Sequence, residues 1–290
     1  MYLEKMKRLS VGLLLLSALV PVAGDAFGTN DWISAEASID FASRKIFYGY
    51  ALNREPIWIP HAELTFFDTL SPGVTAYCDM TDWGSERRGG PGYGDRSWRY
   101  QEIDPYVRLQ HSFAEDEVSV LPTTVYAAFW YQYEYDPPFP DGSENPDSHF
   151  LDGCIALPEL WLEPTLYAEF DMDRDHGIYL NLDVGHSFAL CGDEEDPILA
   201  VRIDVAQGWG NADRNEAYSG VARAGLMDTM LRLTLEWTPY PWLEIAPYVA
   251  YYEYIFDRHL RHGARRISYG GDPETESWSF LGGVRITVSF

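Results

Sequence analysis

The clearest pattern in the chain is an alternation of apolar and polar side chains, and it is strongest in the segment from Trp278 to Phe290. Side chains of an extended strand point to opposite faces in turn, so this segment has two different faces. The apolar face holds Trp278, Phe280, Gly282, Val284, Ile286, Val288 and Phe290, opposite Ser279, Gly283, Arg285, Thr287 and Ser289. A soluble edge strand can show this pattern, but a strand that ends the chain on an aromatic residue better suits a membrane barrel, with lipid outside and a polar lumen inside.

The same alternation, interrupted by connections rich in Gly, Pro, Asp and Asn, predicts strands along the whole chain. The expected ranges are 32–41, 44–52, 57–67, 73–83, 98–113, 119–135, 160–172, 177–190, 198–209, 227–238, 243–256 and 276–290. The first two join into one strand if Ala42-Ser43 is not a turn, but bacterial single-chain barrels favour even numbers. We therefore expect an all-β fold, a transmembrane antiparallel up-and-down β-barrel of about 12 strands, with about 10–14 as alternatives.

The N-terminal segment 1–26 has the features of a secretory signal peptide. Lys5, Lys7 and Arg8 precede a short apolar core at 11–20, and small residues follow at 24–26. The core is too short for a spanning helix, which needs about 20 apolar residues. We expect an exported protein in which residues 27–290 form one outer-membrane barrel domain.

Charge and aromatic content narrow the class further. The net charge of -24 argues against binding nucleic acid, which requires clustered Lys and Arg. An aromatic content of 15% argues against disorder. The 20 Tyr and 10 Trp residues suit the aromatic girdles of a membrane barrel.

Several segments resemble a known family. They are Ser43-Arg44-Lys45-Ile46-Phe47-Tyr48-Gly49-Tyr50, Glu102-Ile103-Asp104-Pro105-Tyr106, the expected hairpin 167–188 and the closing strand. The closing strand resembles that of bacterial outer-membrane barrels, and the set resembles the TorF-like porin family, whose substrate is unassigned. The resemblance implies the outer membrane of a Gram-negative bacterium, and a terminal Phe290 that the barrel assembly machinery recognises.

Assigning the polar face of each strand to the inside predicts the lumen lining. It comprises Glu36, Asp40, Glu63, Asp79, Glu102, Asp104, Arg108, Glu134, Glu163, Glu169, Asp183, Arg202, Asp204, Arg232, Glu236 and Arg285. The excess of carboxylates predicts a water-filled pore that concentrates cations. The alternative is a plugged interior in which these groups form salt bridges, since about 12 strands lie between the filled and open barrel sizes. Aromatic residues share this face, and girdles or packing explain them better than stacking on a sugar or base; they are Trp98, Tyr100, Tyr106, Tyr126, Trp130, Trp161, Tyr167 and Tyr179.

Two of the three cysteines are candidates for a disulfide. A hairpin symmetric about Met172 and Asp173 would place Cys154 opposite Cys191. Export permits disulfides, so we expect this pair to be bridged if the strand register holds.

A basic segment stands out in this acidic chain, with Arg258, Arg261, Arg265 and Arg266 between residues 257 and 275. If Phe290 marks the periplasmic end, this loop is extracellular. It can bind lipopolysaccharide phosphates or guide anionic solutes to the mouth, it can contact partner proteins as an outer loop of a plugged barrel, or it is simply solvated. The same counting puts the long loops 84–97 and 136–157 on the periplasmic side, where barrels have short turns. That conflict stays open at the level of sequence.

Motifs for catalysis or metal binding are weak. His111-Ser112 and His186-Ser187 are neighbours on strands, so each pair points to opposite faces. The acidic tip at 171–175 lacks the Gly and the distal Glu of a calcium loop, so we expect no metal and no cofactor. The set of nucleophile, base and orienting group that a hydrolase requires is missing, so we expect no enzyme. The expected function is a channel for passive diffusion of small polar or cationic solutes, and the alternative is a plugged structural or interaction barrel.

Overall fold

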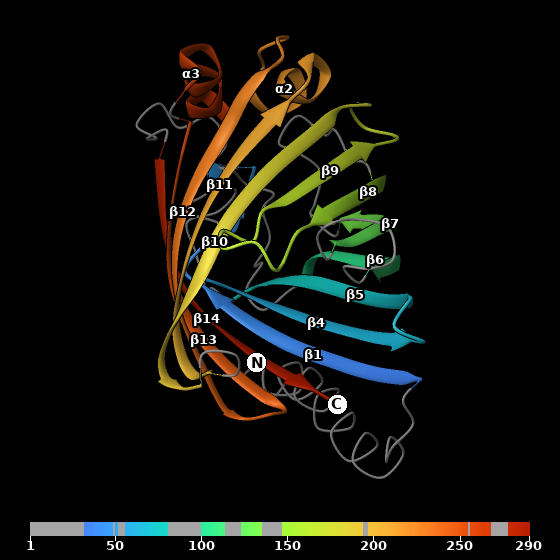
Figure 1. The fold of residues 1–290 in the computed structure, drawn as a ribbon. Coiled ribbons are helices and arrows are strands. Elements are labelled where there is room, and N and C mark those ends of the chain that lie inside the picture. Colours follow the sequence, from blue (N-terminus) through green and yellow to red (C-terminus); the bar gives the residue numbers. More distant parts are fainter. Residues whose placement is uncertain are drawn as a thin grey trace, which may run out of the picture.

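The structure, a computed structural model, describes residues 32–48, 50–51, 56–80, 100–113, 123–134, 147–193, 197–254, 256–267 and 278–290. Twelve antiparallel strands close into a barrel (Figure 1), which confirms the predicted fold class. The strands are β1 (Ile33–Ala42), β4 (Ile57–Phe66), β5 (Leu70–Asp79), β6 (Tyr100–Phe113), β7 (Thr123–Glu134), β8 (Ser148–Ala156), β9 (Thr165–Asp171), β10 (Ile178–Gly192), β11 (Pro197–Gly210), β12 (Gly225–Tyr240), β13 (Leu243–Glu253) and β14 (Trp278–Ser289). Pairing of β1 with β14, in which Asp40 lies opposite Arg285, closes the barrel.

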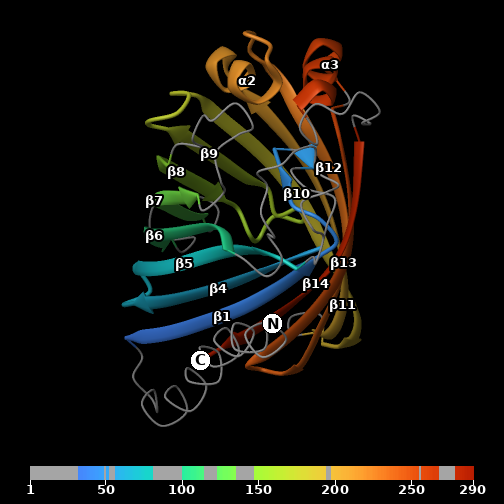
Figure 2. The same ribbon diagram turned by 180° about the vertical axis from the view of Figure 1, so that it is seen from behind.

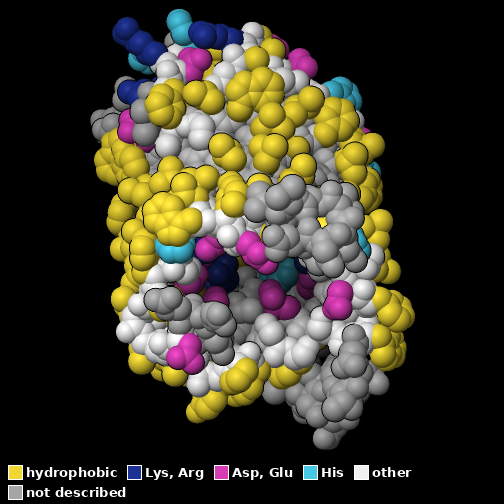
Figure 3. Space-filling model, viewed as in Figure 1, with side chains coloured by type: hydrophobic (Ala, Val, Ile, Leu, Met, Phe, Trp, Pro, Cys, Tyr) yellow, Lys and Arg dark blue, Asp and Glu magenta, His cyan; other side chains and the backbone are white. Residues whose placement is uncertain are grey.

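The outer surface of the wall carries large apolar side chains that water would not favour. Examples with 42–56% exposure are Val107, Leu109, Phe129, Leu151, Ile155, Leu182, Ile203, Leu231, Leu233 and Phe280. In Figure 3 apolar side chains cover much of the wall, while acidic, basic and histidine side chains gather in a hollow. An apolar exterior around a polar interior is the arrangement of a barrel that faces lipid. Within the described ranges, no helix is long and apolar enough to cross a membrane.

The expected strand at 44–52 is not part of the wall, which corrects the sequence prediction. Ile46–Phe47 (β2) and Tyr50–Ala51 (β3) form a separate two-stranded sheet. This small sheet lies inside the ring of barrel strands (Figure 2). The segment that alternates like a wall strand therefore enters the lumen.

A wall strand that the sequence did not predict, β8, replaces it. On β8 the inward residues are Ser148, Phe150, Asp152 and Cys154, and the outward residues are His149, Leu151, Gly153 and Ile155. Both faces mix polar and apolar side chains, which hides the two-residue period. The predicted strand number was correct because one missed strand compensated for one wrong strand.

With the strands in these positions, the two long loops that follow β5 and β7 no longer fall at the end of the barrel where short turns are expected. The connections 43–56, 80–99, 135–147, 172–177, 211–224 and 254–277 now all leave from one end of the barrel, called here the loop end. The connections 67–69, 114–122, 157–164, 193–196 and 241–242 leave from the other, the turn end, where β1 begins and β14 ends. Two helices, α2 (Ala212–Ser219) and α3 (Arg258–Ile267), belong to the loop end (Figure 1).

The predicted disulfide is wrong. In the β9–β10 hairpin Ile178 lies opposite Phe170, a register different from the symmetric one that was expected. Cys154 lies in β8 and Cys191 in β10, with β9 between those strands. Cys154 and Cys191 are therefore not bridged to each other.

Candidate functional site

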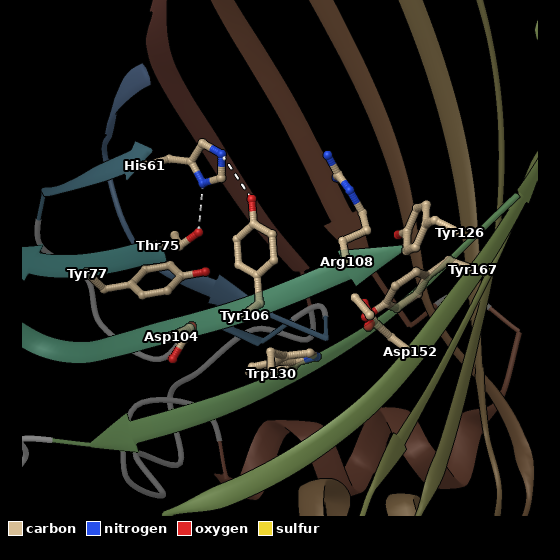
Figure 4. Close-up of a pocket in the computed structure, with 11 residues that line it drawn as sticks. His61, Thr75, Tyr77, Asp104, Tyr106, Arg108, Tyr126, Trp130, Asp152 and Tyr167 are labelled. Atoms are coloured by element: carbon tan, nitrogen blue, oxygen red, sulfur yellow. Dashed lines mark hydrogen bonds between the residues drawn. The ribbon is translucent and has the colours of Figure 1, made fainter. Parts of the chain in front are cut away.

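A polar cavity of about 290 Å³ lies within the barrel (Figure 4), between the strands β4 to β9. It is lined by His61, Thr75, Tyr77, Asp104, Tyr106, Arg108, Tyr126, Ala128, Trp130, Asp152 and Tyr167. These residues meet because inward positions on neighbouring strands are directly opposed, as are His61 with Thr75 and Tyr106 with Trp130. We call this space the central cavity.

A second cavity, of about 510 Å³, lies toward the turn end. It is lined by Glu36, Ser38, His61, Thr238, Pro241, Trp242, Leu243, Glu244, Arg285, Thr287 and Ser289. His61 lines both cavities, so they adjoin at this imidazole. The two cavities thus share one lining side chain between the turn end and the middle of the barrel.

Hydrogen bonds fix the side chains at the junction of the two cavities. His61 Nδ1 lies 3.0 Å from Thr75 Oγ1, and the Tyr106 hydroxyl donates to Glu63. Arg108 Nη2 binds Glu63 Oε1 at 2.5 Å. The Tyr106 ring lies so close to Gly73 that a Cβ there would overlap it. The sequence predicted Glu63 and Arg108 as lumen residues, but the contact of Thr75 with His61 depends on a strand register that it did not give.

The segment that carries β2 lies in the loop-end half of the interior (Figure 2). Lys45 Nζ binds Glu102 and lies 4.2 Å from the centre of the Tyr77 ring, and the Lys45 and Glu102 side chains are only 7% and 6% exposed. The hydroxyl of Tyr48 donates to Glu169. Glu102 and Glu169 therefore face the interior, where side chains of the protein itself bind them.

Arg214 from α2 completes this closed region. Its side chain is fully buried and lies 3.2 Å from both Glu169 and Asp175, while its Nη1 donates to the Tyr48 hydroxyl at 2.8 Å. Burial lowers the pKa of Arg214, but the neighbouring Tyr48 and Glu169 outweigh it and raise the pKa above its usual value. Asn211 places the residue by capping α2, since its side chain accepts from the Arg214 backbone N–H at 3.0 Å. The sequence missed Arg214 because it lies in an expected loop.

Helix α3 packs beside α2 at the same end. Leu260 is fully buried and joins a cluster with Tyr179, Met227 and Tyr254. Gly263 lies so close to the Ser219 carbonyl that a Cβ there would overlap it, so the two helices pack in direct contact.

The predicted basic loop is thus largely a helix. Arg258 is exposed on it, whereas Arg261 Nε donates to the Tyr254 carbonyl at 2.5 Å. Arg265 and Arg266 belong to α3, and their side chains lie outside the described part of the chain.

Other predicted lumen residues form pairs on the inner wall. Arg202 binds both Asp204 and Glu163 at 2.6 Å, and Arg285 lies 3.4 Å from Glu244. The remaining contacts are Asp40 with the Tyr248 hydroxyl at 2.8 Å, Arg232 over the Tyr248 ring at 4.1 Å, and Glu236 with Ser187 at 2.9 Å. The side chains of Asp79 and Glu134 are outside the described set, although their backbones belong to β5 and β7. Asp183 occupies an inward position on β10.

Two placements correct the sequence prediction. Glu163 lies in the 157–164 turn and not in a strand, because β9 begins only at Thr165. Trp161, expected to face the lumen, is 68% exposed on the same turn. Among the described residues, no group of three or more His, Cys, Asp and Glu side chains is placed to hold a metal ion.

Comparison with known proteins identifies no family. No family model matches the chain, so the resemblance to TorF-like porins stays a prediction. No curated protein matches it either. Among solved structures, an outer membrane channel from Pseudomonas putida F1 is similar, with 11% identity over 92% of this chain and 98% of that one and a TM-score of 0.49.

Two further solved structures are similar along most of their length. The KdgM porin in complex with disordered oligogalacturonate is 7% identical over 89% of this chain and 99% of that one, with a TM-score of 0.46. LpxR from Salmonella typhimurium is 10% identical over 87% and 99%, with a TM-score of 0.43. At these identities the similarity identifies no substrate, and the barrel assignment stands on the strand pairing.

Proposed function

We propose that this chain forms an outer-membrane channel through which small polar or cationic solutes diffuse passively. The observation that carries the proposal is the pair of adjoining polar cavities inside a closed barrel whose outer face is apolar. Lipid outside and water inside is the environment that such a wall requires. Catalysis forms no part of the proposal.

The charge of the lumen supports a preference for cations. Around the two cavities, the carboxylates of Glu36, Asp104, Asp152 and Glu244 stand against the guanidinium groups of Arg108 and Arg285. Arg108 is already bound to Glu63. An excess of negative charge in a narrow, low-dielectric passage raises the local concentration of cations and repels anions.

The loop lengths support an orientation in which the loop end is extracellular and the turn end periplasmic. Phe290 is at the turn end, and its backbone exchanges hydrogen bonds of 2.9 and 3.0 Å with Ala35 at the β1–β14 seam. We propose that Phe290 is the residue recognised by the assembly machinery. The proposed signal peptide, 1–26, lies outside the described residues.

A second candidate function follows from the occupied loop-end half. Lys45, Tyr48 and Arg214 fill part of the interior with buried, mutually bonded side chains. This favours a plugged barrel whose outer surface, including exposed Arg258 on α3, contacts lipopolysaccharide phosphates or partner proteins.

Single-channel conductance in a planar bilayer with a salt gradient tests the proposal. Reproducible current steps with cation preference are expected. Replacing Glu36 in the turn-end cavity, as Glu36→Gln, should lower the cation-to-anion permeability ratio by about two- to fivefold. Asp68→Asn is the matched control, because Asp68 is exposed on the 67–69 turn and lines neither cavity. Electrical silence from a correctly folded barrel would favour the plugged alternative.

A further inference from the structure

Several cationic side chains inside this barrel have the same kind of surroundings. Three of them lie against both a carboxylate and the face of an aromatic ring. The sets are Lys45 with Glu102 and Tyr77, Arg108 with Glu63 and Tyr126, and Arg214 with Glu169 and Tyr48. The cation lies 4.2, 5.6 and 5.0 Å from the respective ring centres, within the range of a cation–π interaction.

The central cavity also offers a carboxylate and an aromatic ring, those of Asp152 and Trp130. The three cationic side chains just named do not occupy this position. Asp152 Oδ1 is buried and has no hydrogen-bond partner among the described residues. Trp130 lines the cavity too, with Phe150 stacked on one face at a centroid distance of 3.9 Å. In Figure 4 the guanidinium of Arg108 and the ring of His61 lie on one side of the cavity, while Asp104, Asp152 and Trp130 lie on the other. A buried carboxylate oxygen without a donor favours a ligand that brings one.

We propose that the central cavity binds a small organic cation with a primary ammonium or guanidinium group. The ammonium donates to the Asp152 carboxylate, and the adjoining carbon chain packs against Trp130 and Tyr167. The proposal rests on the proposed channel function and names the solute class of that lumen. A cavity of about 290 Å³ suits a molecule of a few carbon atoms, and the Asp104 and Asp152 carboxylates disfavour an anion.

His61 is the side chain that the central cavity shares with the turn-end cavity. We place the entry of the cation at the turn end, on the His61 side, because the buried Lys45–Glu102 pair lies in the loop-end half. Lys45 Nζ itself lies over Tyr77, which lines the central cavity. A side-chain ammonium of the protein is thus already bound at the edge of the same space.

Isothermal titration calorimetry on the refolded full-length protein in detergent tests this site. The probes are putrescine, 1,4-butanediol and succinate, which share a four-carbon skeleton and differ in charge. We expect putrescine to bind, with an affinity about tenfold lower in Asp152→Asn and about three- to tenfold lower in Trp130→Leu. Butanediol and succinate should bind at least about tenfold more weakly than putrescine.

Asp183→Asn is the matched control, because Asp183 is another inward carboxylate that does not line the central cavity. Its putrescine affinity should stay at the level of the unchanged protein. Equal weakening in Asp152→Asn and Asp183→Asn would overturn the site in favour of a general effect of lumen charge. Heat-modifiable electrophoretic mobility verifies that each variant is folded.

The titration does not depend on ion flow, so the two proposals fail in different ways. Putrescine binding by a barrel that conducts no current would leave the site standing and reject the channel. Conductance by a folded barrel that binds no putrescine would leave the channel standing and reject the site.

Discussion

The two halves of the barrel interior use the same ion-pair chemistry in different surroundings. At the loop end, Arg214 lies 3.2 Å from Glu169 with side-chain exposures of 0% and 5%. At the turn end, Arg285 lies 3.4 Å from Glu244 with exposures of 40% and 33%. The distances are nearly equal, so access to water is what separates the pairs.

This difference assigns different roles to the two halves. A buried charge that loses its partner costs about 3–5 kcal/mol, so the Arg214 contacts contribute strongly to the stability of the folded barrel. An exposed pair contributes about 0–1 kcal/mol and can open and close at little cost. The loop-end half is therefore part of the structural core, and the turn-end half is free to interact with solutes.

The largest expected effect comes from removing the buried guanidinium. Arg214→Met leaves Glu169 and Asp175 buried without their cation and should lower the free energy of unfolding by about 3–5 kcal/mol. Arg285→Met should lower it by less than about 1 kcal/mol. Urea unfolding in detergent micelles, followed by tryptophan fluorescence, measures both. Similar losses in the two variants would contradict the division of the interior.

The next effect concerns the segment inside the lumen. Lys45→Met removes the partner of buried Glu102 and should cost about 2–4 kcal/mol, with an increase in single-channel conductance as the segment loses its anchor. The double variant Lys45→Met/Glu102→Gln should regain most of that stability, because no buried charge is left alone. A double variant as unstable as the single one would show that packing, and not the uncompensated charge, causes the loss.

The smallest effect is a pH response of the 172–177 turn at the loop end, where Asp173 is exposed. Hydrogen bonds from the His149 ring at 2.6 Å and its backbone N–H at 2.8 Å lower the pKa of Asp173. A lowered pKa means that this stabilisation is present above the unfolded value of about 3.9 and is lost as pH falls through the folded value.

The neighbouring Asp175 responds in the opposite direction. Burial raises its pKa, so its protonation favours the folded turn as pH falls. Amide hydrogen exchange of residues 172–177 in acid should therefore show loosening around Asp173 that the variant Asp173→Asn no longer shows. Identical acid responses of the variant and the unchanged protein would rule out the His149 contact as the cause.

Prediction from the sequence succeeded best where the wall separates lipid from water. The observed bounds agree within a few residues with the expected ranges for β12, β13 and β14. In β12, for example, Leu231, Leu233 and Leu235 alternate with inward polar residues. Prediction failed where that separation is weak. In β8 the inward Phe150 and the outward His149 reverse the usual pattern, and in 44–52 the alternation belongs to a segment inside the lumen.

The candidate site was predictable only in part for a related reason. Glu63, Asp104 and Arg108 were expected in the lumen from their strand faces, and they do face it. Thr75 and Asp152 were not, because a residue opposite another is fixed by register, which single-strand patterns do not give. Arg214 was out of reach because its partners come from β9, the 172–177 turn and the β2 segment.

The shortness of β9 has a consequence for the surrounding bilayer. Its 7 residues span about 24 Å along the strand and, at a typical tilt, only about 18 Å along the barrel axis, whereas β10 has 15 residues. The turn that follows β8 presents exposed Trp161 and Leu162, and the Leu162 carbonyl accepts from the Gly185 N–H at 2.8 Å. A hydrocarbon layer of about 30 Å does not match so low a wall. Lipid beside β9 should therefore be thinner than lipid beside β11 and β12, so the protein would set an uneven membrane thickness around its own circumference.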